Sequence, residues 1–353
     1  MNNKIKDIYH KLKEEGLDAL LVLSPANISY LTGFLSRDAH LLVSSKKNIY
    51  FTDSRYIQAV RKSLKGCLLK EADSNGFKHF MEAFYKLGFK RLGFEKEHLS
   101  LALYQKLRRE SAGRGITLIP VCGIIEEFRQ IKNEDELEKI RFACGIAIKA
   151  LRNIKDFIAP GKREIEVAGE LERYLRYAGA SRASFDIIVA SGPNSSLPHH
   201  ITGSRKIRDN EPVLVDVGAD YLGYKSDLTR VFFSGRINTL YRKIQDIVHK
   251  ARDLAVQEIK PGKIARDIDF LARSFIAEKG YGKYFFHSLG HGIGLEVHEG
   301  LSLSPKSDNI LKSGMVLTVE PAIYLPDKFG SRVEEMVLVT RKGCEVLSGA
   351  LDK

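Results

Sequence analysis

The feature that most constrains the fold of this chain is an internal repeat in its second part. The segment IAPGKREIEVAGELERYLRYAGA (158–180) aligns with IKPGKIARDIDFLARSFIAEKGYG (259–282), so that Pro160 pairs with Pro261 at an offset of 101 residues. The helical patterns before the two copies, 135–157 and 236–258, repeat at the same offset. Each copy is followed by two strand-like stretches: SFDIIVAS and VLVDVGAD after the first, YFFHSLGH and VLTVEPAI after the second. Residues from about 134 onward therefore predict two helix–helix–strand–strand units in a pseudo-two-fold pair, with a site in the cleft between them.

The first 125 or so residues alternate between strand and helix patterns. Short apolar runs bounded by turn residues predict strands at DALLVLS, HLLVSS, NIYFTD and ITLIPV. Helical patterns occupy IKDIYHKLKEEG, SRYIQAVRKSL, FKHFMEAFYKLG and LALYQKLRRE. This alternation predicts an α/β layer domain over residues 1–126. A second domain, 127–353, opens with a helix predicted over 134–157, which Asn133 caps together with Glu136 in a capping box.

Composition and motifs exclude several classes of protein. The net charge is +12, but Lys and Arg are mixed with acidic residues along the helices, which argues against nucleic-acid binding. The N-terminus lacks the pattern of a signal peptide, and no apolar run is long enough to span a membrane. No P-loop is present, and GHGIG lacks the dinucleotide-binding spacing. The four cysteines form no CxxC pair, which fits reduced thiols in the cytoplasm: Cys67, Cys122, Cys144 and Cys344.

Acidic residues stand in several apolar strand patterns. Asp216 and Asp227 flank a turn in VLVDVGADYLGYKSDLTR, where an antiparallel hairpin places them opposite each other. Glu320 ends the apolar run VLTVEP, and Glu334 and Glu335 lie within SRVEEMVLVT, where alternation sends only one of the two inward. Burying unpaired carboxylates costs several kcal/mol. Read alone, the aspartates also fit an exposed pair on a solvated hairpin, but a cation cluster accounts for all these positions together.

Three histidines, His287, His291 and His298, lie in the glycine-rich stretch FFHSLGHGIGLEVHE. A single histidine beside apolar residues is more often a packed core residue than a ligand. Carboxylates with one imidazole suit a pair of divalent ions such as Mn²⁺, Co²⁺ or Fe²⁺ better than a structural zinc. Two such ions, about 3.5 Å apart, hold and acidify a water molecule and polarise the carbonyl group that it attacks.

Four stretches, in order, resemble the creatinase/methionine aminopeptidase family, whose catalytic domain has the pita-bread fold: VDVGADYLGYKSDLTR, SLGHGIGLEVHE, LTVEPAIY and SRVEEMVLVT. The nearest members are Xaa-Pro aminopeptidases and Xaa-Pro dipeptidases (prolidases). SPANISYLTGF and FTDSRYIQAV resemble the creatinase-type N-terminal domain. The resemblance covers the whole chain. It implies a creatinase-like α/β domain (1–126) followed by an α+β pita-bread domain with an internal duplication (127–353).

The resemblance also implies which residues hold the metal ions. Asp227 and Glu334 match the ligands that bridge the two ions in the family. Asp216 matches a ligand that completes one ion, and His291 and Glu320 match those that complete the other.

Further positions match residues that act on the substrate in the family. Glu320 matches the proton shuttle, and His199 and His298 match histidines that orient the substrate and stabilise the intermediate. Arg332 matches an arginine near Glu334 and the substrate, and Tyr324 a tyrosine close to the metal site. The pattern leaves His287 as a packed or surface histidine and His200 undecided.

These matches predict a cytoplasmic, homodimeric Xaa-Pro aminopeptidase. It would hydrolyse the bond between an N-terminal residue and proline with two divalent ions, Mn²⁺ or Co²⁺ before Fe²⁺ or Zn²⁺. The alternatives are an Xaa-Pro dipeptidase, restricted to dipeptides, and a non-catalytic pita-bread binding module. Two departures from the family stand out: Leu301 replaces a frequent proline, and SRDAH (36–40) replaces a run of small residues. SRDAH follows NISYLTGF, whose pattern is strand-like. We expect SRDAH, with Arg37, Asp38 and His40, to be an exposed connection from which Arg37 or Asp38 reaches the partner's site.

Overall fold

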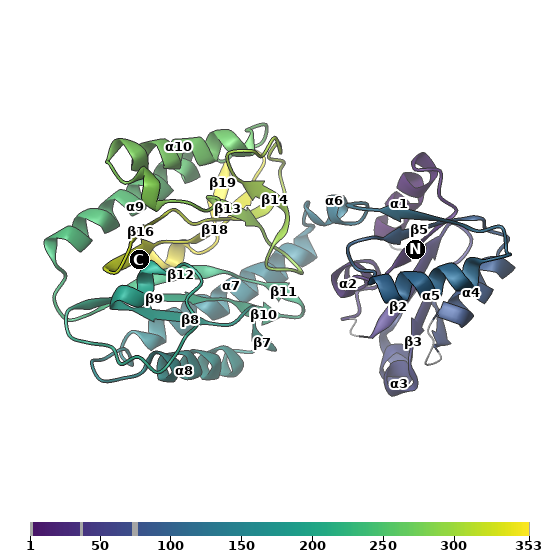
Figure 1. The fold of residues 1–353 in the computed structure, drawn as a ribbon, viewed down its shortest axis with the longest axis horizontal. Coiled ribbons are helices and arrows are strands. Elements are labelled where there is room, and N and C mark those ends of the chain that lie inside the picture. The colour runs from purple at the N-terminus through teal and green to yellow at the C-terminus, as the bar shows by residue number, and fades with distance from the viewer. Residues whose placement is uncertain (1–2, 36–37, 73–76, 353) are drawn as a thin grey trace. The chain divides into compact units, whose positions relative to one another are not determined.

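The computed structural model describes residues 3–35, 38–72 and 77–352, and the chain divides into two compact units, Met1–Arg129 and Gln130–Lys353 (Figure 1). The boundary predicted after residue 126 falls within the short helix α6 (Glu126–Arg129). Within the described residues, no helix has the length and apolar character needed to cross a bilayer.

The N-terminal unit is built on one mixed six-stranded sheet in the order β4-β3-β2-β1-β5-β6. Strand β1 pairs antiparallel with β2 and parallel with β5. The apolar faces of α4 (Phe77–Lys86) and α5 (Leu101–Ser111) pack against one side of this sheet, where Phe80, Phe84 and Leu107 are fully buried. The strands are β1 Ala19–Val22, β2 Ala39–Ser44, β3 Ile49–Thr52, β4 Leu68–Glu71, β5 Arg91–Glu95 and β6 Thr117–Val121, and the other helices are α1 Asn3–Glu14 and α3 Ser54–Ser63.

The stretch NISYLTGF, strand-like in the sequence, instead lies in helix α2 (Pro25–Thr32) except for its last two residues. Its start follows from Pro25 at the first helical position and from Ser24, whose side chain accepts a hydrogen bond from the backbone N–H of Asn27. Gly33 ends the helix with a φ of 69°, a left-handed conformation that glycine adopts readily. These local caps outweigh the apolar alternation.

The expectation for residues 36–40 is only partly open to comparison, because Ser36 and Arg37 lie outside the described residues. Asp38 is exposed, and its carboxylate accepts a hydrogen bond from the hydroxyl of Tyr56. His40 is not in an exposed connection: it lies in β2, and its ring centroid is 5.2 Å from that of Phe77. This position agrees with the strand predicted at HLLVSS, which begins at His40, and contradicts only the exposed connection; the observed strand begins one residue earlier, at Ala39.

The second unit contains two helix pairs. Helix α7 (Glu134–Ile154) packs with α8 (Glu164–Tyr177), and α9 (Thr239–Glu258) packs with α10 (Ala265–Glu278). Helices α8 and α10 start and end at positions related by the offset of the sequence repeat. The capping box between Asn133 and Glu136 is present at the start of α7. Figure 1 shows α10 above the strands and α8 below them.

The strands between the helix pairs form several sheets. The first half contributes β12-β9-β8, and the second half contributes β14-β13-β15-β18-β19. Of the predicted strand YFFHSLGH, only its end is extended, because β13 covers Gly290–Gly292 alone. The bounds are β7 Arg182–Ala183, β8 Ile188–Ser191, β9 Glu211–Val217, β10 Ala219–Tyr221, β11 Tyr224–Lys225, β12 Leu228–Ser234, β14 Glu299–Leu303, β15 Val316–Val319, β16 Ala322–Leu325, β17 Phe329–Arg332, β18 Glu335–Val339 and β19 Cys344–Val346.

The register between β9 and β12 differs from the hairpin predicted from the sequence. Asp216 pairs with Thr229, not with Asp227. The chain departs from a plain hairpin at Gly218, where an added Cβ would lie 1.9 Å from the backbone oxygen of Ser226. Beyond this close approach the chain forms the separate small sheet of β10 and β11. Asp227 therefore lies just before β12, two residues before Thr229, which takes the predicted position opposite Asp216.

Candidate metal centre

The predicted ligands converge at the ends of strands from both halves of the second unit. They line a cavity of about 790 Å³ together with His199, His298 and Arg332. Each ligand takes its position from a strand: Asp216 lies in β9, Asp227 before β12, His291 in β13, Glu320 after β15 and Glu334 before β18. The duplicated architecture thus brings together side chains that are more than one hundred residues apart.

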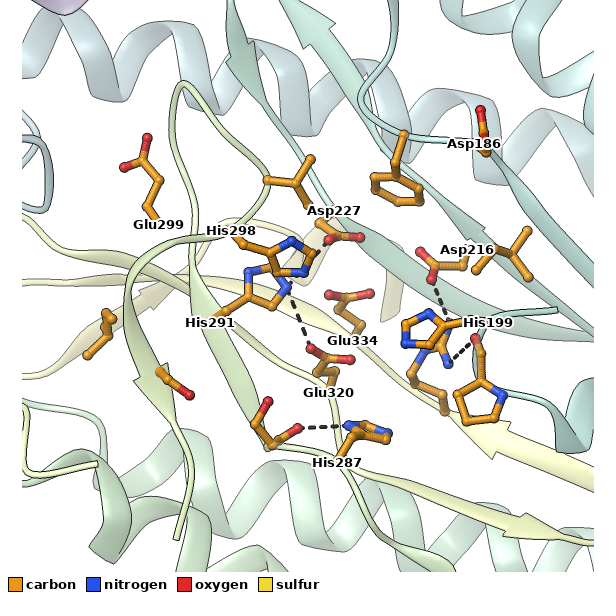
Figure 2. Close-up of a pocket in the computed structure, with 18 of the residues that line it drawn as sticks. Asp186, His199, Asp216, Asp227, His287, His291, His298, Glu299, Glu320 and Glu334 are labelled. Atoms are coloured by element: carbon orange, nitrogen blue, oxygen red, sulfur yellow. Dashed lines mark hydrogen bonds and ion pairs between the residues drawn. The ribbon is translucent and has the colours of Figure 1, made fainter. Parts of the chain in front are cut away.

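The centre of the cluster is formed by Asp227, His291 and Glu334. One ligand atom from each of these residues lies within 4.8 Å of the others. The Nε2 atom of His291 is 3.6 Å from Oδ2 of Asp227 and 3.6 Å from Oε1 of Glu320 (Figure 2). Nδ1 of His291 lies 3.1 Å from the backbone oxygen of Gly292, so Nδ1 carries the ring proton and Nε2 presents its lone pair to the carboxylates.

Arg332 connects the cluster to its surroundings. Its Nη2 donates to Oδ2 of Asp216 at 2.6 Å, and its Nε donates to Oγ1 of Thr229 at 2.9 Å. Thr229 in turn donates from Oγ1 to Oε2 of Glu334 at 2.8 Å. The other oxygen of Asp216, Oδ1, is buried and has no hydrogen-bond partner among the described residues. Such an atom is costly to bury unless it binds a cation or another donor.

The charges in the cavity repel one another. Burial, then the neighbouring Glu334 and Asp216, raise the pKa of Asp227 well above its usual range. Burial, then Glu320 and Asp216, raise the pKa of Glu334 in the same way. Burial also raises the pKa of Glu320 to about 8, with Arg332 opposing the rise and Asp216 adding to it. A single guanidinium does not balance four carboxylates, so the site favours additional positive charge.

Burial favours the neutral form of two histidines beside the carboxylates, His291 and His298. Burial, and then the proximity of His298, lowers the pKa of His291 to about 4. Burial, followed by His199, lowers the pKa of His298. The rings of His291 and His298 lie with centroids 4.2 Å apart. Figure 2 shows His199 on the opposite side of the cluster, near Asp216.

His287, taken from the sequence as a packed or surface histidine, is largely buried but also lines the cavity. Its Nδ1 lies 2.8 Å from the backbone oxygen of Ser288, and its Nε2 lies 3.2 Å from the hydroxyl of Tyr324. Tyr324 accepts a hydrogen bond from Nη1 of Arg332 at 2.6 Å and therefore donates its own proton to His287. Burial lowers the pKa of His287 to about 4, which keeps it a neutral acceptor.

Glu334 and Glu335 do point to different sides, as alternation predicts, but both are buried. Glu334 faces the cavity. Glu335 bonds instead to Arg230 at 2.7 Å and to Arg252 at 2.9 Å. The second carboxylate of this pair is thus balanced by arginines that the sequence pattern did not single out.

Sequence reasoning did not name Thr229, and it gave His287 no role in the site. Thr229 links Arg332 to Glu334, and its signal is its place two residues after Asp227 on the same alternating strand. His287 joins the cavity through Tyr324, and its signal is its spacing of four residues before His291. Spacing alone did not distinguish either residue from a packing position.

Comparison with known proteins agrees with this architecture. A model described as metallopeptidase family M24 matches residues 138–341, and one described as the creatinase/prolidase N-terminal domain matches residues 4–131. An Xaa-Pro dipeptidase of Pyrococcus horikoshii is 36% identical over 352 residues, which cover 99% of this chain and 97% of that protein.

Solved structures extend the similarity to three dimensions. An Xaa-Pro dipeptidase from Bacillus anthracis has a TM-score of 0.94 at 38% identity, covering 98% of this chain and 97% of that one. An X-Pro aminopeptidase from Thermotoga maritima has a TM-score of 0.88 at 34% identity, covering 96% of this chain and 97% of that one.

The chain belongs to metallopeptidase family M24. It is a metallo-exopeptidase with a creatinase-type N-terminal domain and a pita-bread catalytic domain, which confirms the fold class expected from the sequence. Members of this family depend on divalent metal ions.

Proposed function

We propose that this protein is an Xaa-Pro dipeptidase, which hydrolyses the bond between an N-terminal residue and a C-terminal proline. The observation that carries the proposal is that five metal-type ligands line one cavity in a chain that aligns over nearly its whole length with Xaa-Pro dipeptidases. From the sequence motifs, we expected an Xaa-Pro aminopeptidase and kept the dipeptidase as the alternative. The relatives favour the dipeptidase, so we adopt it.

The residues of the cavity fit two divalent cations. The ligands would be Asp216, Asp227, His291, Glu320 and Glu334. The unpartnered Oδ1 of Asp216, the lone pair of His291 Nε2 and the mutual repulsion of the carboxylates each favour a bound cation. Oxygen ligands with one imidazole match Mn²⁺ or Co²⁺. When bound, such ions supply positive charge that polarises the scissile carbonyl and acidifies a water molecule.

The protein's own side chains would carry the remaining steps. Glu320, at the edge of the cluster beside His291, takes the proton of the attacking water and passes it to the proline nitrogen as that nitrogen leaves. His298 and His199, on either side of the cluster, donate hydrogen bonds to the substrate oxygen as negative charge develops. Arg332 keeps Asp216 and Tyr324 in place, since it bonds to both. This protonation is needed because an amide anion is a poor leaving group, and the proline nitrogen carries no proton of its own in the peptide bond.

An Xaa-Pro aminopeptidase, which also accepts longer peptides, is the second candidate. The observation in its favour is the structural similarity to an X-Pro aminopeptidase from Thermotoga maritima. The two candidate enzymes catalyse the same hydrolysis. They differ in whether the substrate can have further residues after the proline.

A substrate panel separates the two. The purified protein, stripped of metal and reloaded with Mn²⁺, Co²⁺ or Zn²⁺, is given matched Xaa-Pro dipeptides and Xaa-Pro-Xaa tripeptides. We expect kcat/KM for the dipeptides to exceed that for the tripeptides by at least about tenfold. Equal or faster cleavage of tripeptides would establish the aminopeptidase. The homodimer is a separate prediction, which light scattering would check.

A further inference from the structure

Two adjacent histidines in the loop after the 3₁₀ helix η1 (Gly192–Ser196) face opposite ways. His199 is exposed and lines the cavity. The side chain of His200 is only 12% exposed, and its Nε2 lies 2.9 Å from Oε2 of Glu164, the fully buried first residue of α8. A carboxylate oxygen accepts hydrogen bonds, so Nε2 of His200 carries the proton of this contact.

Glu164 also holds the segment that leads to His199. Its Oε1 accepts hydrogen bonds from the backbone N–H and the hydroxyl of Ser191, each at 2.7 Å. Both its oxygens accept from Nδ2 of Asn194, at 3.0 and 3.1 Å. Ser191 ends β8 and Asn194 lies in η1. One carboxylate thus ties together the end of a strand, the 3₁₀ helix and the loop that follows it.

The internal repeat shows that the helix start itself does not need this carboxylate. The counterpart of Glu164 at the repeat offset is Ala265, the first residue of α10, which is also fully buried. The same helix therefore begins with an apolar side chain in one half and a buried acid in the other. Burying a carboxylate is costly unless it is fully hydrogen-bonded, and the partners of Glu164 given above all lie in the segment 191–200.

The orientation of His199 depends on its neighbours. Among the described residues, its imidazole makes no hydrogen bond of its own. On one side, the backbone oxygen of Pro198 accepts a hydrogen bond from Nη1 of Arg332 at 3.4 Å. On the other side, His200 is held by Glu164, and Thr202 is bonded to the backbone of Ile187 and Val189. The backbone N–H of His200 also donates to the backbone oxygen of Leu197 at 3.2 Å, and the side chain of His200 adds the contact with Glu164.

We propose that Glu164 and His200 form a positioning pair that holds the backbone beside His199 so that its imidazole faces the cavity. The inference rests on the proposed function, because that function is what brings His199 into contact with the substrate. His200 and Glu164 touch no substrate themselves and act through His199.

The test uses three single variants of the full chain. His200→Ala removes the hydrogen bond, and His200→Gln restores an N–H donor of similar reach. The matched control is Asn238→Ala, which removes the side chain that caps α9 by accepting from the backbone N–H of Tyr241, away from the cavity. Two quantities are measured: kcat and KM of the metal-loaded enzyme on an Xaa-Pro dipeptide, and hydrogen–deuterium exchange of residues 197–202 in metal-free protein.

We expect His200→Ala to lower kcat/KM by about 10- to 100-fold and to speed exchange at 197–202, and His200→Gln to recover most of both. Asn238→Ala should lower the melting temperature without either effect. In a His199→Ala background, His200→Ala should add no further loss of kcat/KM. Glu164→Gln, which keeps the size of the side chain, should have the same effects on kcat/KM and on exchange as His200→Ala. It replaces His200→Ala in the test if the His200→Ala protein fails to fold.

Unchanged kcat and KM in His200→Ala, or losses that add fully to those of His199→Ala, would overturn the positioning pair. So would exchange at 197–202 that matches the wild type. If the wild-type protein cleaves no Xaa-Pro peptide with any metal, the proposed function fails instead, and the exchange measurement still decides whether the pair holds the loop.

Discussion

Lys132 and Glu299 form a buried ion pair, with Nζ of the lysine 3.0 Å from Oε2 of the glutamate and side-chain exposures of 3% and 5%. The other oxygen of Glu299 accepts a hydrogen bond from the backbone N–H of Glu296. Glu299 directly follows His298, and Figure 2 shows its carboxylate pointing away from the cluster of predicted ligands. The pair therefore anchors the loop that presents His298 to the cavity.

Removing one partner of this pair should be strongly destabilising. We expect Lys132→Met to lower the free energy of unfolding of the catalytic unit by about 3–5 kcal/mol, because it leaves a carboxylate buried without its cation. The double variant with Glu299→Leu should recover part of this loss. Urea unfolding followed by circular dichroism measures both. A single variant as stable as the wild type would show that the pair contributes no net stability.

Asp227→Asn should remove at least one bound metal ion per chain and most of the activity. An amide is neutral and cannot bridge two cations as a carboxylate does. Metal content per chain, measured by elemental analysis after dialysis, and turnover of an Xaa-Pro dipeptide test this together. Two retained ions with near-normal turnover would refute the assignment of Asp227 as a bridging ligand.

His298→Ala should keep the metal content and lower kcat by roughly 10²-fold or more, the scale of losing one donor to developing charge. His10, exposed on α1, supplies a control histidine whose replacement should change neither quantity. Loss of metal from the His298 variant would instead make His298 a ligand and call the role of His291 into question.

Chelation should destabilise the protein as well as inactivate it. A ligand present at 100 times its dissociation constant stabilises the folded state by about 2.7 kcal/mol. The melting temperature should therefore fall when metal is stripped and recover when Mn²⁺ is added back. In Asp227→Asn the same treatment should have a much smaller effect. If the melting temperature of the wild type were the same with and without metal, this result would contradict a buried cation site.

His40 should make the stability of the N-terminal unit depend on pH. Burial lowers the pKa of His40, so protons bind the unfolded chain more readily than the folded one. Stability should be complete above the ordinary histidine pKa of about 6.5 and should fall as the pH drops through that value. Unfolding measured at about pH 7.5 and about pH 5.5 checks this. His40→Phe should flatten the difference, and His10→Gln should leave it unchanged.

The sequence by itself determined the elements that depend on local chemistry. The capping box of Asn133 and Glu136 predicts where α7 begins, because both hydrogen bonds span only three residues. The repeat at 158–180 and 259–282 predicts α8 and α10 at matching positions. The family follows from the resemblance of four stretches in the same order, which contain Asp216, Asp227, His291, Glu320 and Glu334.

Only the tertiary structure decided which side chains meet. Asp216 faces Thr229 rather than Asp227 because Gly218 lets the chain approach Ser226 and break the hairpin, a contact that alternation does not encode. The side chain of His200 points inward because it bonds to the buried carboxylate of Glu164, which lies thirty-six residues earlier in the chain. Lys132 and Glu299 are 167 residues apart, and no local pattern pairs them. The burial of a side chain and the register of a strand depend on the packing of elements that are distant in the sequence. The positions of the charged groups in this site depend on that packing as well.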